Sequence, residues 1–386
     1  MSYYHPQYPD TPALKKAAKK RIPAFAFDYL CGGCHDEIGV AHNASSFTQV
    51  KLQSDLLAPT PEIDLSVELF GKRYAAPFGV APVGLQGLMW PKAPEILAKA
   101  AYKANLPYVL STVSSASLET IAEISEGTAW YQLYNPTDAK IRDDLMGRIK
   151  RAGYKVLVVT VDVPTFGYRP RDIKNGLAMP PKMNLRNIAQ MMQCPSWSWQ
   201  TLLAGVPEMQ TLKPYMPKNM PTSELANFMN NTVMGAVDFE SLKVIRDNWD
   251  GPLVLKGLVN PEDVAQAVAL GADGVVLSNH GGRQLDVGES PLDTIQTIQH
   301  QYGDKIKLLM DSGVQSGGNI AQAMAMGADF TLLGRTFVYA CGAVGRHGGE
   351  HAIEMLTQQM TQVMGQLKCP TPTQLPHFLK AGPGVA

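Results

Sequence analysis

The chain has few of the features that mark secreted, membrane-spanning or nucleic-acid-binding proteins. Its 386 residues include five cysteines, an odd number that favours reduced thiols over a disulfide framework. No segment approaches the ~18 consecutive apolar residues that a membrane-spanning helix needs. Lysine plus arginine and aspartate plus glutamate are equal at 34, so the formal charge is zero. The sequence therefore lacks the basic surface expected of a nucleic-acid-binding protein.

Two further signals are missing. Residues 1–6 carry no charged segment followed by an apolar one, as a signal peptide would, so we expect a cytoplasmic protein, either free or peripheral at the inner face of the membrane. No Gly-x-Gly-x-x-Gly motif follows an apolar run, which argues against a Rossmann nucleotide site. The hydrophobic content of 45% is sufficient for a full globular core.

What the sequence does contain is a series of short apolar runs, each followed by a longer segment with helical periodicity. Their continuous hydrophobicity is typical of parallel strands that are covered on both faces. The runs are residues 78–81, 108–111, 130–133, 156–160, 253–256, 274–277, 307–310 and 330–333. The clearest helical segments between them are residues 93–103, 138–151, 261–270 and 319–326. Eight such units predict a (β/α)8 barrel, the TIM-barrel fold of the α/β class.

We expect residues 1–386 to form one domain with two additions to the barrel. Residues 1–70 precede the first strand and are predicted to pack helices across one end. Residues 176–236 form a long insertion after the fourth strand, a position typical of a lid, a partner surface or a mobile loop. Within it, residues 183–203 could contact a membrane surface, although their low charge argues against strong attachment.

Polar side chains gather at the carboxyl ends of the predicted strands, which form the active face of such a barrel. These residues are Gln132, Tyr134, Thr160, Asp162, Lys256, Ser278, His280, Asp311, Gly334 and Arg335. Hydrogen bonding at the rim of the core is the alternative explanation. The loop 278–286 is the most informative, because it places His280 three residues before Arg283 around two glycines. A base that titrates near neutral pH beside a fixed cation is suited to removing a proton from a small anionic substrate.

The loop 278–286 also resembles the signature of the FMN-dependent α-hydroxy-acid oxidising enzymes, which include glycolate oxidase, L-lactate dehydrogenase and mandelate dehydrogenase. The likeness covers nearly the whole chain. It includes residues 27–29, 81–84, 130–134, 160–162, 169–172, 255–257, 311–313 and 334–335. Pro180-Pro181-Lys182 and Trp197-Ser198-Trp199 bring the sequence nearest to the bacterial L-lactate dehydrogenase branch.

The resemblance implies FMN as the cofactor, since no side chain accepts two electrons. It places the flavin ring against the backbone of Pro82, Val83 and Gly84, with Lys256 near its N1 region. Further polar contacts would come from Ser111, Gln132, Thr160 and Ser278. The phosphate would lie on two loops, formed by Asp311, Ser312 and Gly313 and by Gly334 and Arg335. No metal is implied.

The same resemblance assigns the substrate contacts. Arg169 and Arg283 would hold the carboxylate, and Tyr29 and Tyr134 would donate hydrogen bonds. His280 would be the base, oriented by Asp162, with Tyr134 and Lys256 completing the catalytic set. The implied reaction is oxidation of a lactate-like L-2-hydroxy acid to the 2-oxo acid, with electrons passed to a quinone or other carrier. Members of the family often form tetramers, so we expect a homo-oligomer by analogy.

Several residues depart from the family pattern or leave alternatives open. Many members carry Arg or Lys where Gln315 stands, so FMN retention could be weaker here. Val113 replaces a tryptophan of glycolate oxidase-like members, which favours substrates larger than glycolate. Gly84 favours a dehydrogenase, yet two alternatives remain: an oxidase that releases hydrogen peroxide, and a tailoring flavoenzyme that acts on a larger or peptide substrate. Cys31 and Cys34 have the spacing of a redox pair or half a zinc site, but no second pair matches them, which favours a simple turn.

Overall fold

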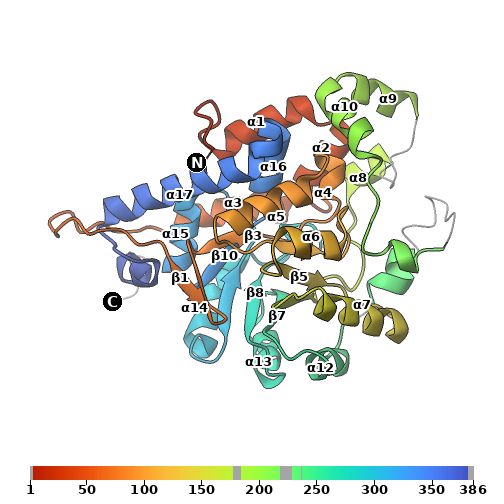
Figure 1. The fold of residues 1–386 in the computed structure, drawn as a ribbon. Helices are drawn as coiled ribbons and strands as arrows, with labels where there is room; N and C mark the ends of the chain where they lie inside the picture. The colour runs from red at the N-terminus through yellow and green to blue at the C-terminus, as the bar shows by residue number, and fades with distance from the viewer. Residues whose placement is uncertain (1–2, 177–183, 218–227, 236, 381–386) are drawn as a thin grey trace.

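The molecule is built around a barrel of eight parallel strands (Figure 1). The computed structural model describes residues 3–176, 184–217, 228–235 and 237–380. The strands are β3 (Phe78–Val80), β4 (Val109–Ser111), β5 (Trp130–Leu133), β6 (Leu157–Thr160), β7 (Leu253–Leu258), β8 (Gly274–Leu277), β9 (Lys307–Met310) and β10 (Phe330–Leu333). They pair in the order β3-β10-β9-β8-β7-β6-β5-β4, and a parallel bridge between Val80 and Tyr108 closes the ring. The predicted barrel is confirmed.

Helices follow the strands and cover the outside of the barrel. They are α4 (Gln86–Met89), α5 (Ala93–Lys103), α6 (Leu118–Ile124), α7 (Ala139–Arg151), α8 (Pro170–Asn175), α12 (Phe239–Asp247), α13 (Pro261–Ala269), α14 (Pro291–Tyr302), α15 (Gly317–Ala325), α16 (Arg335–Val344) and α17 (Gly348–Leu367). Many begin at a side chain that accepts a hydrogen bond from the first turn, as Asp138 does for α7 and Ser316 does for α15. Two short 3₁₀ turns, η4 (Gly345–His347) and η5 (Pro372–Phe378), complete the C-terminal region.

The segment before the barrel contributes helices and a hairpin. It contains α1 (Thr11–Arg21), α2 (Ala24–Cys31), α3 (Ile38–Ser45), η1 (Ser46–Gln49), β1 (Val67–Leu69) and β2 (Lys72–Tyr74). The antiparallel β1–β2 hairpin packs on Trp130 and Phe330, the first residues of β5 and β10, and the Trp130 indole donates to the Tyr74 hydroxyl at 3.1 Å. The hairpin, which sequence periodicity did not reveal, therefore covers the amino end of the barrel and leaves the carboxyl end open for a site.

The described part of the insertion is helical. It contains α9 (Leu185–Met192), α10 (Pro195–Ala204), η2 (Lys213–Tyr215) and the π-helical turn η3 (Met229–Val233). Trp197 anchors α10, because its ring packs edge-on against Phe25 and its indole donates to the Leu88 carbonyl at 3.0 Å. Pro180-Pro181-Lys182 lie outside the described residues. In the part of the chain that the structure describes, no helix combines the length and apolar character needed to span a bilayer.

Candidate functional site

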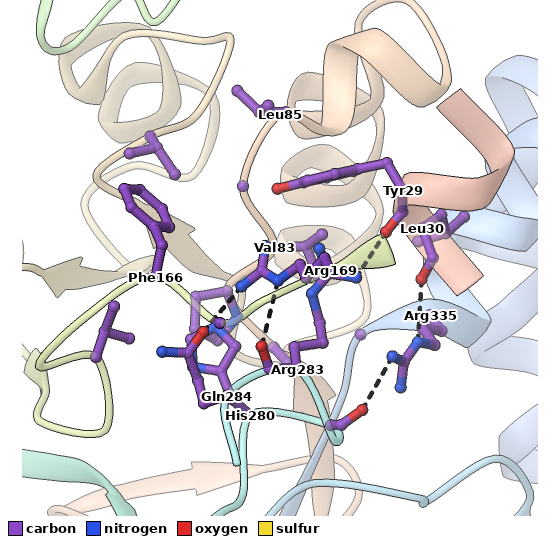
Figure 2. Close-up of a pocket in the computed structure, with 18 of the residues that line it drawn as sticks. Tyr29, Leu30, Val83, Leu85, Phe166, Arg169, His280, Arg283, Gln284 and Arg335 are labelled. Carbon is purple, nitrogen blue, oxygen red and sulfur yellow. Dashed lines mark hydrogen bonds between the residues drawn. The ribbon is translucent and has the colours of Figure 1, made fainter. Parts of the chain in front are cut away.

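One large cavity opens at the carboxyl ends of the strands, and Figure 2 shows the residues around it. Its volume is about 720 Å³, within the usual range for small-molecule sites. Fourteen of the predicted site residues line it: Tyr29, Pro82, Val83, Gly84, Tyr134, Arg169, Lys256, His280, Arg283, Asp311, Ser312, Gly313, Gly334 and Arg335. Because parallel strands end at one edge, residues far apart in the sequence meet here.

The other five predicted residues do not line this cavity. They are Ser111, Gln132, Thr160, Asp162 and Ser278. All lie at or just beyond a strand end, and Ser111, Gln132, Thr160 and Ser278 are at most 3% exposed. Ser278 and Asp162 contact lining residues, as described below, so they support the wall from behind. The Gln132 side-chain oxygen accepts weakly from the Thr112 amide at 3.3 Å.

His280 and Asp162 form a hydrogen-bonded pair between the loops after β8 and β6. The distance between His280 Nδ1 and Asp162 Oδ1 is 2.9 Å. The backbone at His280 is left-handed, with φ of 56°, and Gly281 and Gly282 continue that conformation. This backbone conformation costs about 1 kcal/mol at a histidine. Gly281 and Gly282 adopt it without that cost, because they have no Cβ atom. Since the carboxylate accepts from Nδ1–H, the neutral ring keeps its lone pair on Nε2.

The electrostatics of this pair favour a neutral base. Burial lowers the pKa of His280 below its ordinary value, and the Asp162 carboxylate opposes this only partly. Burial raises the pKa of Asp162, but the charge and hydrogen bond of His280 and the charge of Lys256 outweigh it, so the Asp162 pKa is lowered. At neutral pH the pair is therefore an uncharged imidazole beside a carboxylate, ready to accept a proton.

A bulge in β7 brings Asp162 close to the strand. Gly257 has a φ of 110°, and the register with β8 shifts between Lys256 and Leu258. A Cβ atom at Gly257 would lie 2.4 Å from the Asp162 carboxyl carbon. A glycine is thus required here, both for the backbone conformation and for the approach of Asp162.

Lys256 is a buried cation held by two partners. Its ammonium lies 2.7 Å from Asp311 Oδ2 and donates to Ser278 Oγ at 2.8 Å. The residue is 4% exposed. Because the ion pair fixes the ammonium at the cavity wall, a developing negative charge in the cavity would meet a positioned cation without reorganisation.

Two arginines stand beside His280 (Figure 2). Arg283 donates through Nη1 to the carbonyls of Tyr29 and Gly32 at 2.6 and 2.9 Å, and its guanidinium lies 4.7 Å from the centre of the Tyr29 ring. Arg283 Nη2 is buried and has no hydrogen-bond partner among the described residues. Arg169 donates to the Arg283 carbonyl at 3.2 Å and to Gln284 Oε1 at 2.9 Å. Burial and the neighbouring Arg283 lower the pKa of Arg169. The region can therefore receive a carboxylate.

Arg335 closes the far side of the cavity. It donates to the carbonyls of Leu30, Gly32 and Gly281, each at 3.0 Å. Burial lowers its pKa, yet an arginine stays protonated. The turn 31–34 thus supplies acceptors to both Arg283 and Arg335. All five cysteines are free, and burial raises the pKa of Cys31 and of Cys34, as expected for structural thiols.

Much of the cavity wall is formed by residues that carry no functional signal in the sequence. These residues include Leu85, Val163, Phe166, Ile173, Met209, Met229, Met234 and Gln284. Only Gln284 lies in a recognisable motif. It bridges the loops after β6 and β8 by donating to the carbonyls of Asp162 and Thr165 at 3.2 and 3.0 Å. Within the described residues, no group of three or more His, Cys, Asp or Glu side chains could hold a metal ion.

The residues present fit a flavin mononucleotide. The Gln132 amide nitrogen and Arg283 Nη2 are buried donors without partners among the described residues, and both suit acceptors on a bound molecule. The loops after β9 and β10 bring Gly313, Gly334 and Arg335 to the same cavity, where backbone amides and a guanidinium can receive a phosphate. Gly313 has a φ of 89°, and a Cβ atom there would lie 2.2 Å from the Asn43 carbonyl oxygen, so the loop depends on glycine.

Comparison with known sequences agrees with the fit of the cavity residues to FMN. Residues 18–380 match the family described as FMN-dependent dehydrogenase. The L-lactate dehydrogenase of Vibrio cholerae serotype O1 is 35% identical over 351 residues, which cover 91% of this chain and 93% of that protein. The (S)-mandelate dehydrogenase of Pseudomonas putida is 35% identical over 367 residues, which cover 95% of this chain and 92% of that protein.

Solved structures of similar proteins give the same result as the sequence comparison. A crystal structure of the monotopic membrane protein (S)-mandelate dehydrogenase superposes with a TM-score of 0.91 at 34% identity, covering 97% of this chain and 100% of that chain. A mandelate oxidase structure, bound to (S)-2-phenylpropionate, superposes with a TM-score of 0.81 at 31% identity, covering 98% and 100%.

Proposed function

The chain belongs to the FMN-dependent dehydrogenase family, and from this premise we propose that it oxidises an L-2-hydroxy acid to the 2-oxo acid, with His280 as the base. FMN is its cofactor, and it is an oxidoreductase that acts on CH–OH donors. The hydrogen bond between His280 and Asp162, beside two arginines in one cavity, is the observation that carries the proposal. Lactate is the simplest chiral substrate of this class.

The arginines orient the acid. Arg169 and Arg283 bind its carboxylate, and Tyr29 and Tyr134 donate hydrogen bonds to the remaining oxygens. Burial raises the pKa of Tyr134, so its hydroxyl keeps its proton and remains a donor. Holding the acid at both ends fixes which face of its hydroxyl-bearing carbon meets His280, and this selects one enantiomer.

His280 then receives a proton from the substrate on Nε2, while its Nδ1–H stays with Asp162. The Asp162 carboxylate stabilises the imidazolium that forms. FMN, when bound, would accept the two electrons and the second proton that leave the substrate. We assign the backbone of 82–84 to its ring, Lys256 to the charge that would develop on it, and the 311–313 and 334–335 loops to its phosphate. Ser111, Gln132, Thr160 and Ser278, at the strand ends behind the cavity wall, would support the ring.

The test is anaerobic mixing of the holoenzyme with a panel of 2-hydroxy acids, followed at the flavin absorbance band. We expect bleaching by the L enantiomer of at least one acid. In His280→Gln the protein should still bind FMN, while the bleaching rate falls on the order of 10²-fold or more. A normal rate in that variant would remove His280 as the base, and no bleaching by any acid would favour the tailoring enzyme.

We propose that the electrons pass to a quinone or other carrier. The glycine at position 84 supports this, because the dehydrogenases that the sequence resembles tend to have glycine there. Admitting air or a soluble quinone to the bleached enzyme separates the two acceptors. Fast recovery of colour with quinone and slow recovery in air is the expected result. Fast recovery in air with release of peroxide would make the protein an oxidase.

We also propose that the insertion contacts a membrane surface. Large apolar side chains of α9 and α10 are exposed, among them Leu185 (88%), Leu202 (73%) and Trp199 (60%). Such clusters on a soluble surface mark interaction sites. We expect sedimentation with anionic lipid vesicles, reduced severalfold in Trp199→Ser/Leu202→Ser. If the unmodified protein and the double variant sediment equally, or if neither sediments, α9 and α10 do not form a membrane contact.

A further inference from the structure

We propose that the natural substrate is a 2-hydroxy acid with a large apolar group on its hydroxyl-bearing carbon, rather than the methyl group of lactate. This inference rests on the proposed function and adds the substrate class. It comes from the apolar residues that line the same cavity as the arginines.

The two sides of the cavity differ in chemistry. His280, Arg169 and Arg283 lie together on one side, whereas Leu85 and Phe166 stand apart from them on the other (Figure 2). Six further lining residues of the same cavity are apolar and come from separate segments. They are Val113 after β4, Val163 after β6, Ile173 on α8, and Met209, Met229 and Met234 in the insertion. An acid whose carboxylate lies on the arginines would direct its 2-substituent away from them, towards Leu85, Phe166 and such apolar lining residues.

The apolar lining residues range from buried to exposed. Leu85, Val113 and Met229 are 8%, 7% and 3% exposed, whereas Phe166 and Ile173 are 38% and 59% exposed. A methyl substituent would leave most of these side chains without contact, whereas a larger apolar group would pack on the buried ones and displace water from the exposed ones. The gain is about fourfold in affinity for each buried methylene.

The three methionines indicate what shape of group the wall accepts. Met209, Met229 and Met234 are unbranched thioethers from the insertion, so they can rearrange around groups of different outline and make favourable contacts with aromatic rings. The branched lining residues Leu85, Val113, Val163 and Ile173 cannot adapt in this way. The part of the lining formed by the methionines therefore favours a class of large apolar substituents, aromatic groups included.

Val113 and Gly84 lie against each other in the cavity wall near Tyr29. A Cβ atom on Gly84 would lie 2.6 Å from Val113 Cγ2 and 3.5 Å from the Tyr29 hydroxyl. The side chain at position 113 therefore stands beside the polar groups that receive the acid. A larger residue there would fill the space between the hydroxyl-bearing carbon and the apolar wall.

The first test is a substrate series on the unmodified holoenzyme. The acids are glycolate, L-lactate, L-2-hydroxy-4-methylpentanoate, L-3-phenyllactate and L-indole-3-lactate. We expect kcat/KM to rise along the series by on the order of tenfold or more between lactate and phenyllactate. If lactate is oxidised best, this inference is wrong while the proposed function stands. If none of the acids is oxidised, the proposed function itself fails.

The second test is the substitution Val113→Trp. We expect the ratio of kcat/KM for phenyllactate to that for lactate to fall at least tenfold. Calorimetric titration of the holoenzyme with phenylpyruvate and pyruvate should show the same loss of preference. The matched control is Val244→Trp on the outer face of α12, where Val244 is 38% exposed and lies outside the cavity. An unchanged ratio in Val113→Trp would overturn the inference, and the substrate series decides the matter even where that variant does not fold.

Discussion

At the scale of single residues, the pair formed by His280 and Asp162 determines when the site can accept a proton. Burial lowers the pKa of His280, and the Asp162 carboxylate 2.9 Å away raises it again in part. A base acts only when deprotonated. kcat/KM should therefore increase as pH rises through the His280 pKa and level off below neutrality, because that pKa lies under the usual ~6.5.

The substitution Asp162→Asn tests this pair. Removing the carboxylate removes the charge that raises the His280 pKa, so the rising limb should move to lower pH. The rate should also fall by about 10²- to 10⁴-fold, because the imidazolium loses its stabilising partner. The measurement is the pH profile of anaerobic flavin bleaching. A control is Asp263→Asn, an exposed carboxylate in the first turn of α13, which should leave the profile in place. A limb that moves to higher pH would contradict the assignment.

At the scale of elements, the turn 31–34 supports the site through its backbone. The carbonyl of Gly32 accepts from both Arg283 and Arg335, and those of the preceding Tyr29 and Leu30 each accept from one of them. The turn is close to the 280–286 loop, since the Cys34 amide donates to the Gly282 carbonyl at 3.0 Å. The Cys34 thiol donates to the same carbonyl oxygen at 3.4 Å, and the small Gly33 allows the close approach.

The substitution Gly33→Ala should separate the turn from that loop. The added methyl would lie 2.4 Å from Val40 Cγ2 and 2.7 Å from the Gly282 carbonyl oxygen. Such overpacking costs about 1–3 kcal/mol, so the Tm should fall by several degrees. KM for the acid should rise on the order of tenfold, because Arg283 would be displaced with the turn.

The matched control for Gly33→Ala is Gly318→Ala in α15. A methyl group there would meet only Ser316 Oγ, at 3.6 Å, so the substitution should be neutral or slightly stabilising. Thermal melts and steady-state kinetics on both variants provide the comparison. If Gly33→Ala has the same Tm and KM as the unmodified protein, the turn does not position Arg283.

The strands and loops differ in how well the sequence predicts them. The strands could be predicted because continuous apolar runs such as 274–277 exclude most other structures, and the polar residues behind them meet by parallel geometry alone. The carbonyl acceptors of the turn 31–34 had no such signal, since every residue has a carbonyl. Met209, Met229 and Met234 could not be placed either, because the path of a long insertion is set by tertiary packing rather than by periodicity.

At the scale of the whole molecule, cofactor binding and folding stability are linked where the N-terminal segment contacts the loop after β9. The Thr11 hydroxyl at the start of α1 donates to the Gln315 carbonyl at 2.5 Å, so the N-terminal segment is tied to the loop after β9. Arg335 already donates to three carbonyls, and the neutral Gln315 brings no cation to the loop after β9. A phosphate at this place would depend mainly on Arg335 for its counter-charge.

The substitution Gln315→Arg should therefore strengthen FMN binding. One charge-assisted hydrogen bond is worth about 1.5–3 kcal/mol, so the Kd for FMN should fall by tenfold or more. Because FMN binds the folded chain, each tenfold decrease in Kd adds about 1.4 kcal/mol of stability at a fixed excess of FMN. The measurements are fluorescence titration of FMN and thermal melts with and without it.

The control for Gln315→Arg is Gln358→Arg on the exposed side of α17, which adds the same charge away from the cavity. It should leave both the Kd and the stabilisation by FMN unchanged. If Gln315→Arg raises the Tm equally with and without FMN, the arginine stabilises the fold rather than the phosphate. In that case the phosphate does not lie beside position 315. If the Kd falls and only the FMN-bound Tm rises, the loop after β9 is the phosphate site, and its neutral glutamine sets how tightly the molecule holds its cofactor.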